Sequence, residues 1–300
     1  MFRYILFVRS LIFLAFFCIT SSLHTLEAHQ DVIQEMRGER LERVDKDIED
    51  ELAKAKLQAE ENFYKYLAMN IEFSPLHKQA RWVGYFISRE RLEGEHFKRR
   101  GIAFAEDERI KGGSAQDADY RNSGYDRGHL APARDMAFSK ETLRQSFLFS
   151  NISPQKPKFN RGKWSQLEQF AREKAMKMGK IIVITGPIFT GERIETIGEN
   201  KVGVPTLFFK ALLFYTEERV EAIGFVMPNE KLKEELDTYA CSIDSMEEIA
   251  KIDVFSALPD ELEETVEASL NWDFWFGKRQ AGDFQEVDSQ EEMDVIESND

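Results

Sequence analysis

The spacing of apolar residues along this chain follows two patterns, one typical of strands and one typical of helices. Short runs rich in β-branched and aromatic residues predict strands, and they occupy residues 82–88, 181–184, 207–215 and 219–227. The last two runs are separated by Glu217 and Glu218, which predicts an antiparallel hairpin that turns there. The central part of the chain is therefore expected to be rich in strands.

In other segments the apolar residues recur at the spacing of a helix. Residues 159–179 are expected to form a helix, with apolar positions at Phe159, Trp164, Leu167, Phe170, Ala171 and Met178. A second helix is expected over residues 139–147. Ser245 and Glu248 have the spacing of a capping box and predict a helix that begins there. Another helix is expected to start at Pro259 and Asp260.

Residues 29–70 are expected to form a helical arm that is kinked near Gly38. Its apolar positions recur at spacings of three and four, close to a heptad repeat: Leu41, Val44, Ile48, Leu52, Ala55, Ala59, Phe63 and Tyr66. This stripe fits an amphipathic helix that lies on the main domain, and it also fits a coiled-coil arm that would make a homodimer. Residues 70–77 show no clear strand pattern.

Residues 1–28 have the pattern of a secretory signal. Arg3 and Arg9 form a basic start, residues 11–19 are apolar, and Ala28 offers a cleavage point. Export to the periplasm or the exterior is the first prediction. An uncleaved membrane anchor is the second, because the residues before Ala28 fit the small-residue cleavage pattern poorly. A mitochondrial presequence is the alternative for a eukaryotic source.

The net charge of −14 hides a division within the chain. Residues 71–180 carry 22 Lys and Arg against 14 Asp and Glu, so the remainder is strongly acidic. The basic half is suited to a polyanionic substrate. Residues 278–300 are predicted to be a disordered acidic tail, since residues 281–300 hold eight acidic residues and no basic one.

A chain of 300 residues is long enough for one large domain with additions, and that domain is placed at residues 71–277. Beyond the predicted signal, Cys241 is the one cysteine left in the sequence. No intrachain disulfide can then form, so the domain must be stabilised by its core. Cys241 is expected to be a buried strand residue.

The candidate chemistry begins at one short motif, Asp126-Arg127-Gly128-His129. Hydrolysis of a phosphodiester needs a base that deprotonates water, and His129 is the candidate. It needs a divalent cation, for which Mg²⁺ can use a single neutral amide oxygen as its protein ligand. It also needs cationic groups for the phosphate oxygens, which arginine supplies.

The helix at 159–179 places three further polar residues on one side. Asn160 lies at its expected start, where asparagine is a favoured cap. At about 100° per residue, Glu168 lies about 80° and Arg172 about 120° around the helix from Asn160. This spacing predicts an amide, a carboxylate and a guanidinium in a row, with His129 arriving from the preceding segment.

These motifs together resemble the DNA/RNA non-specific endonucleases, a family of ββα-metal nucleases, and within it the endonuclease G branch. The resemblance covers roughly residues 76–275. Besides the residues named above it rests on residues 81–83, 150–155, 185–187, 204–210 and 226–229, and on Arg100 with Phe104. It implies an α+β fold with a central antiparallel sheet flanked by helices and a ββα-metal motif. The helical arm lies outside it.

The resemblance also implies an activity and a set of roles. The activity is metal-dependent hydrolysis of DNA and RNA with Mg²⁺ or Mn²⁺, leaving 5′-phosphate ends. Asn160 would anchor the metal, Glu168 would hold water around it, and Arg172 and Arg100 would contact phosphate. Arg99 is the neighbour that competes with Arg100 for this role. The remaining candidates are Arg127, Asn151 and Asp126.

The last three candidates have open or supporting roles. Arg127 either contacts phosphate or holds the turn, Asn151 supports the base, and Asp126 fixes the loop. A protein of another class fits the same sequence: a catalytically silent protein that binds nucleic acid or a partner and uses its arm for assembly. Inhibition by a partner protein is a further open question.

Overall fold

The computed structural model describes residues 62–277 of the chain. Contacts divide the chain after Leu270 into two units. The first contains every element from β1 to α9. In the second, the described part is residues 271–277, where α10 (Trp272–Phe276) begins after Asn271, whose side chain accepts a hydrogen bond from the Phe274 amide.

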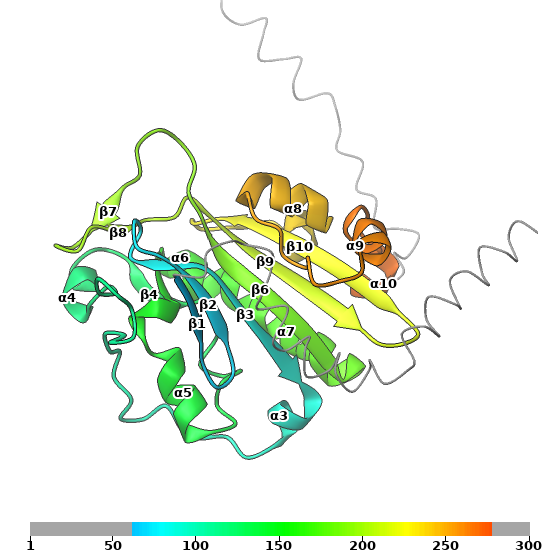
Figure 1. The fold of residues 1–300 in the computed structure, drawn as a ribbon, viewed down its shortest axis with the longest axis horizontal. Helices are drawn as coiled ribbons and strands as arrows, with labels where there is room; N and C mark the ends of the chain where they lie inside the picture. Colours follow the sequence, from blue (N-terminus) through cyan, green and yellow to red (C-terminus); the bar gives the residue numbers. More distant parts are fainter. Residues whose placement is uncertain (1–61, 278–300) are drawn as a thin grey trace, which may run out of the picture. The chain divides into compact units, whose positions relative to one another are not determined.

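A seven-stranded sheet forms the centre of the first unit (Figure 1). Every pair of neighbouring strands in it is antiparallel. The order is β1 (Phe63–Lys65), β2 (Asn70–Ser74), β3 (Gln79–Ser88), β6 (Lys180–Ile188), β9 (Leu207–Tyr215), β10 (Val220–Pro228) and β11 (Ala240–Cys241). Two smaller pairs stand apart, namely β4 (Asp126–His129) with β5 (Ile152–Gln155), and β7 (Thr196–Ile197) with β8 (Val202–Gly203).

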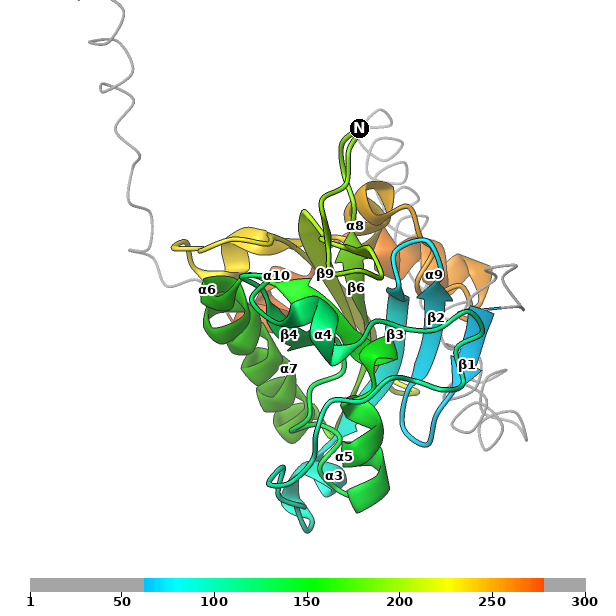
Figure 2. The same cartoon turned by 90° about the vertical axis from the view of Figure 1, so that its left-hand side faces the viewer.

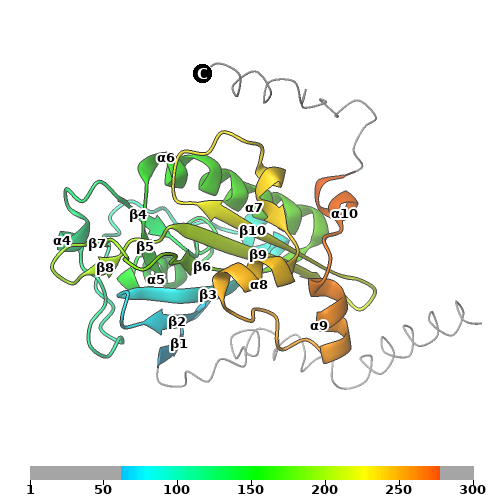
Figure 3. The same cartoon turned by 90° about the horizontal axis from the view of Figure 1, so that it is seen from above.

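Helices cover both faces of this sheet. The long helix α7 (Ser165–Met178) packs on β6 and β3, while α8 (Ile243–Ala250) and α9 (Asp260–Glu267) pack on β10. Figures 2 and 3 show α7 on one side of the sheet and α8 with α9 on the other. The remaining helices are α3 (Arg89–Glu93), α4 (Asp117–Tyr120), α5 (Lys140–Ser146), α6 (Pro157–Phe159), the π-helical turn Asn160–Trp164 and the 3-10 turns Phe149–Asn151 and Leu236–Tyr239.

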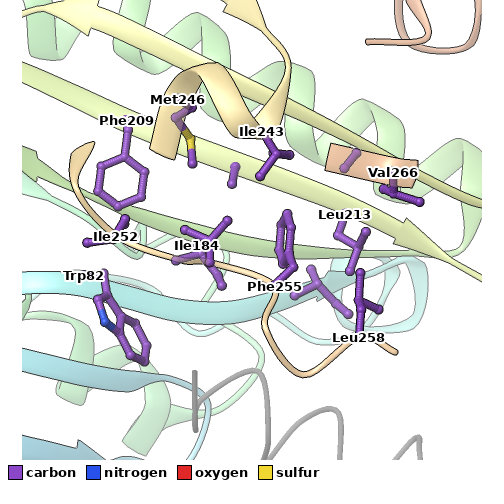
Figure 4. Packing of buried hydrophobic residues seen from close by; sticks show 14 of the residues in the cluster. Trp82, Ile184, Phe209, Leu213, Ile243, Met246, Ile252, Phe255, Leu258 and Val266 are labelled. Carbon is purple, nitrogen blue, oxygen red and sulfur yellow. The ribbon is translucent and has the colours of Figure 1, made fainter. Parts of the chain in front are cut away.

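Alternation along β9 explains why the middle strands are apolar on both faces. Phe209, Ala211 and Leu213 enter the core under α8 and α9, together with Met246 and Val266 (Figure 4). The preceding residue Phe208 faces the other way, stacks on Phe159 and contacts Trp164. The sheet is therefore buried between two helical layers.

Most sequence-based expectations are confirmed. The four strands exist, the hairpin of β9 and β10 turns between Tyr215 and Val220, α5 is capped by Ser139, and α9 starts after Pro259. The predicted α+β class with a central antiparallel sheet is also confirmed. Among the residues that the structure describes, no helix is both long and apolar enough to cross a membrane.

Four expectations are wrong at residue level. The predicted arm does not continue as helix through Phe63–Lys65, which forms β1. The strand that residues 70–77 failed to suggest is present as β2. The cap of α8 is Ser242 instead of Ser245, and Asn160 is a helical residue following α6 instead of a cap. For the first two, pairing with neighbouring strands decided what local pattern could not.

The other predicted segments lie outside the described residues. These are the signal at 1–28, the greater part of the arm at 29–70 and the acidic tail at 278–300. Their predicted roles in export, assembly and solubility stay predictions.

Candidate active site

The hairpin of β4 and β5 carries the histidine motif. In its register Asp126 pairs with Gln155 and His129 with Ile152. Gly128 lies directly against the Gln155 side chain, where a Cβ atom would come within 2.2 Å of Oε1. Any larger residue would displace the buried Gln155 side chain, so glycine allows this close approach beside Arg127 and His129.

His129 lies half-buried between two phenylalanine rings. Its ring centroid is 5.4 Å from that of Phe104 and 4.9 Å from that of Phe147, which it meets edge-on. Burial lowers the pKa of His129 to about 3, and the charge of Arg99 adds to this effect. The buried Nε2 atom has no hydrogen-bond partner. The imidazole is therefore neutral at working pH, which is the form that can accept a proton.

Arg99 and Arg100 differ in their surroundings. The Arg99 guanidinium lies 5.1 Å from the centroid of Phe147 and 6.0 Å from that of Phe104, the two rings that flank His129. Arg100 is exposed in the turn that follows. The geometry thus favours Arg99 over the nominated Arg100 as the cation beside the histidine. Sequence spacing to Phe104 could not separate two adjacent arginines.

Arg127 is anchored on the same side of β4. Its Nη2 atom donates to the Asp117 carboxylate at 2.7 Å and to the Asp117 carbonyl at 3.1 Å. The guanidinium also lies over the rings of Phe104 and Tyr120. Of the two roles left open for Arg127, these contacts favour holding the motif in place.

Asp126 connects the hairpin to the turn that carries Asn160. Its carboxylate accepts hydrogen bonds from Arg161 at 2.7 and 2.8 Å and from Asn160 Nδ2 at 2.9 Å. This agrees with the expectation that Asp126 fixes the loop. The amide nitrogen of Asn160 is used as the donor in this hydrogen bond, so the amide oxygen is the atom left to bind a metal ion. Oxygen is the ligand atom that Mg²⁺ prefers.

Two buried asparagines hold the backbone around these residues. Asn151 Oδ1 accepts from the Ala131 amide at 2.9 Å, and its Nδ2 donates to the carbonyls of Ala131 and Ser146. It therefore fixes the chain just after His129, as its supporting role predicts. Asn229 similarly accepts from the Lys156 amide at 2.8 Å and fixes the corner between β5 and α6.

Glu168 and Arg172 belong to a buried charge network under α7. Arg172 is 7% exposed and pairs with Asp135 at 2.9 Å. Burial raises the pKa of Glu168, and the buried ammonium of Lys210 opposes that rise. Lys210 Nζ lies 4.6 Å from the centroid of Trp164. These contacts do not favour Arg172 as a phosphate ligand, because its guanidinium is already paired inside the protein.

Sequence reasoning did not assign a role to Asp135 or Lys210. Lys210 had a detectable signal, since it is the single charged residue in an otherwise apolar strand. Asp135 had none, because it lies in the loop between β4 and α5. Both are fully or almost fully buried, so their charges act on Glu168 and Arg172 through a medium that screens weakly.

The candidate residues thus form three groups. His129, Arg99 and Arg127 surround Phe104; Asp126 holds Asn160 and Arg161; and Glu168 shares the buried network. Within residues 62–277 no hydrogen bond joins one group to another. A cleft of about 410 Å³ opens beside Tyr125 and Lys156, next to the hairpin, and neither His129 nor Asn160 lines it.

A two-stranded hairpin followed directly by a helix, with the histidine on the first strand and the asparagine at the entry to the helix, defines the ββα-metal class of nucleases. Residues 50–261 match the model of the DNA/RNA non-specific endonuclease family, and the chain belongs to that family.

The relatives support the endonuclease G branch. The chain is 35% identical to human mitochondrial endonuclease G over 188 residues, which is 58% of this chain and 63% of the relative. It is 34% identical to the Caenorhabditis elegans protein of the same name over 196 residues, covering 60% of this chain and 64% of the relative. A mitochondrial nuclease of Saccharomyces cerevisiae is 32% identical over 199 residues, covering 59% and 60%. The chain thus spans less than two thirds of the length of these relatives.

A solved structure has the same fold. It is the crystal structure of a complex between EndoG and EndoGI, described as showing the mechanism of EndoG inhibition. The match has a TM-score of 0.62 and 26% identity, and it covers 66% of this chain and 87% of that one. The α+β fold predicted from the resemblance is confirmed by this neighbour.

Proposed function

We propose that this protein is a metal-dependent endonuclease that hydrolyses the phosphodiester bonds of DNA and RNA. The observation that carries the proposal is the neutral His129 with an unpartnered Nε2, on the hairpin that also positions the Asn160 amide. Family membership supports the same reaction class.

His129 acts as the general base. The neutral imidazole takes a proton from water, and the resulting hydroxide attacks phosphorus. The P–O3′ bond breaks, and the 3′ oxygen gains a proton from solvent. The phosphate stays on the O5′ atom of the downstream nucleotide, which leaves a 5′-phosphate end. Phe104 and Phe147 keep the imidazole neutral, and Asn151 and Gly128 hold its backbone.

Asn160 would hold the divalent cation, Mg²⁺ or Mn²⁺. Such an ion, when bound, stabilises the negative charge that develops on the leaving oxygen. Asp126 orients the amide so that its oxygen is free for this purpose. Glu168 would orient water near that oxygen, and the buried charges of Lys210, Asp135 and Arg172 set its position and charge.

The substrate would be held mainly through its phosphates. Residues 71–180 supply a net positive charge, and contacts to phosphate carry no sequence information. This accounts for action on both DNA and RNA with little sequence preference. Arg99 is the cation we assign to the phosphate beside His129.

Cleavage of supercoiled plasmid tests the proposal directly. The full chain should nick plasmid in Mg²⁺ or Mn²⁺ and stop when EDTA is added. The nicked products should be ligatable, because ligation requires the 5′-phosphate ends that the proposed reaction leaves. Binding of plasmid without nicking at any metal concentration would contradict the proposal and support the silent binding protein.

Arg99 and Arg100 form a matched pair for a second prediction. Arg99→Ala should lower kcat by roughly 10²-fold, the size of effect seen when one donor to developing charge is removed, whereas Arg100→Ala should stay within a few-fold of the parent. Because Arg99 also lowers the pKa of His129, the acidic limb of the rate profile should move to higher pH in Arg99→Ala. Steady-state kinetics on a pH series that extends down to about pH 3 measure both effects. A larger loss in Arg100→Ala would restore the assignment made from sequence.

The relatives bear on location and partners. The human, Caenorhabditis elegans and Saccharomyces cerevisiae relatives are named mitochondrial, which favours the mitochondrial alternative over export. N-terminal sequencing of the native protein would decide between the two. The solved neighbour is a nuclease–inhibitor complex, and we extend that relation to this chain as a proposal. A homodimer through the predicted arm at residues 29–70 is a further proposal, which light scattering tests.

A further inference from the structure

Three carboxylates meet on the face of the sheet opposite α7. Asp244 and Glu247 lie on α8, and Glu267 is the last residue of α9. One oxygen from each of them lies within 4.8 Å of the other two. Among the described residues this is the group of His, Cys, Asp and Glu side chains whose geometry suits a metal ion, and neither the family motifs nor the proposed mechanism uses it.

Glu267 is the residue of this group whose burial indicates a missing ligand. It is 5% exposed, and its Oε1 atom is buried without a hydrogen-bond partner. A carboxylate that is removed from water without a counter-charge is costly. The other side chains of the group, Asp244 and Glu247, are also carboxyl groups and supply no counter-charge.

The electrostatics of the group point the same way. Burial raises the pKa of Glu267 to about 9 and that of Glu247 to about 7, and the surrounding carboxylates Asp253 and Glu263 raise both further. Glu247 keeps one hydrogen bond, from the Val254 amide at 2.6 Å. At neutral pH and without a cation, Glu267 therefore holds a proton, which a bound cation would displace.

The ligand chemistry favours Ca²⁺. All three ligand atoms are carboxylate oxygens, and they lie within 4.8 Å of one another. Ca²⁺ binds oxygen ligands in flexible geometry, whereas Mg²⁺ demands a near-ideal octahedron and is seldom held by an all-protein cage. Asp244 is exposed, so water can complete the six to eight ligands that Ca²⁺ takes.

We propose that Asp244, Glu247 and Glu267 form a Ca²⁺ site that ties α8 to α9. The site would be structural and separate from Asn160, which lies at the entry to α7 on the other face of the sheet (Figures 2 and 3). Met246 and Val266 are neighbours of two of the ligands and pack in one core cluster (Figure 4). Bound Ca²⁺ would therefore reinforce the packing of both helices on the sheet.

Thermal unfolding of the full chain tests this site without reference to activity. The melting temperature is measured in EDTA and in Ca²⁺ for the parent, Asn160→Ala, Glu267→Gln and Glu264→Gln. Glu264 is the matched control, because it lies on α9 but is exposed and outside the group. At a Ca²⁺ concentration about 100 times its Kd, a single native-state site should raise the melting temperature by roughly 5–10 °C for a domain of this size.

The expected pattern separates this site from the catalytic one. The parent, Asn160→Ala and Glu264→Gln should gain this increment, and Glu267→Gln should not. In EDTA Glu267→Gln should melt at or above the parent, because the amide is neutral. Should Glu267→Gln fail to fold, Asp244→Asn provides the second variant, since this exposed ligand should weaken Ca²⁺ binding at least tenfold by calorimetry. An equal Ca²⁺ increment in Glu267→Gln, no increment in the parent, or loss of the increment in Asn160→Ala would overturn the proposal.

Discussion

Replacement of His129 by alanine should lower the rate of plasmid cleavage by roughly 10²–10⁴-fold, the contribution typical of a positioned general base. The side chain is half-buried and its Nε2 atom makes no hydrogen bond, so its loss breaks no polar contact of that nitrogen. The variant should therefore melt within a few degrees of the parent at neutral pH. Single-turnover cleavage in saturating Mg²⁺ measures the chemical step.

Two controls make this result specific to the base. Imidazole added to His129→Ala should restore part of the rate, because the space between Phe104 and Phe147 is left open. Mn²⁺ binding should persist in the variant, since Asn160 and Asp126 are untouched. Cleavage by folded His129→Ala at the parental rate would show that the proposed mechanism is wrong.

Replacement of Asn160 by alanine should lower cleavage in a different way. It removes the one direct protein ligand assigned to the catalytic ion, so at millimolar Mg²⁺ the rate should fall by more than the roughly 10–100-fold cost of losing an outer partner of a metal site. Higher Mg²⁺ or Mn²⁺ should recover part of the loss, because Glu168 and water remain to hold a weakly bound ion. The measurement is the rate as a function of metal concentration.

Arg161 provides the matched control for Asn160. Both donate to the Asp126 carboxylate, but only Asn160 offers an amide oxygen. Arg161→Gln should therefore change the metal dependence little, and imidazole should have no effect on Asn160→Ala. Equal behaviour of the two variants would assign the loss to a disturbed Asp126 and exclude Asn160 as the metal ligand.

The sequence by itself determined the elements whose pattern is local. The strands expected at residues 181–184, 207–215 and 219–227 were predictable because buried strands of this sheet are apolar on both faces. The hairpin turn was predictable because it is short and polar. The order of His129, Asn160 and Glu168 defined the family, since three residues in order with fixed neighbours are far more specific than any one of them.

Only the tertiary structure decided how the side chains are used. Arg172 has the spacing of a substrate contact, but its pairing with the buried Asp135 depends on a loop 37 residues earlier. Adjacent Arg99 and Arg100 are equivalent in sequence, and the two phenylalanines beside His129 distinguish them. Phe63–Lys65 continues a helical stripe, yet pairing with β2 makes it a strand.

The cluster of three carboxylates, Asp244, Glu247 and Glu267, is the clearest feature that only the tertiary structure decided. In the sequence its members are three among 54 acidic residues, separated by up to 23 positions. The packing of α8 and α9 on the sheet brings their oxygens within 4.8 Å and buries one of them. Burial and charge proximity are properties of the folded chain, because they depend on segments that are distant in sequence, and local pattern cannot contain them.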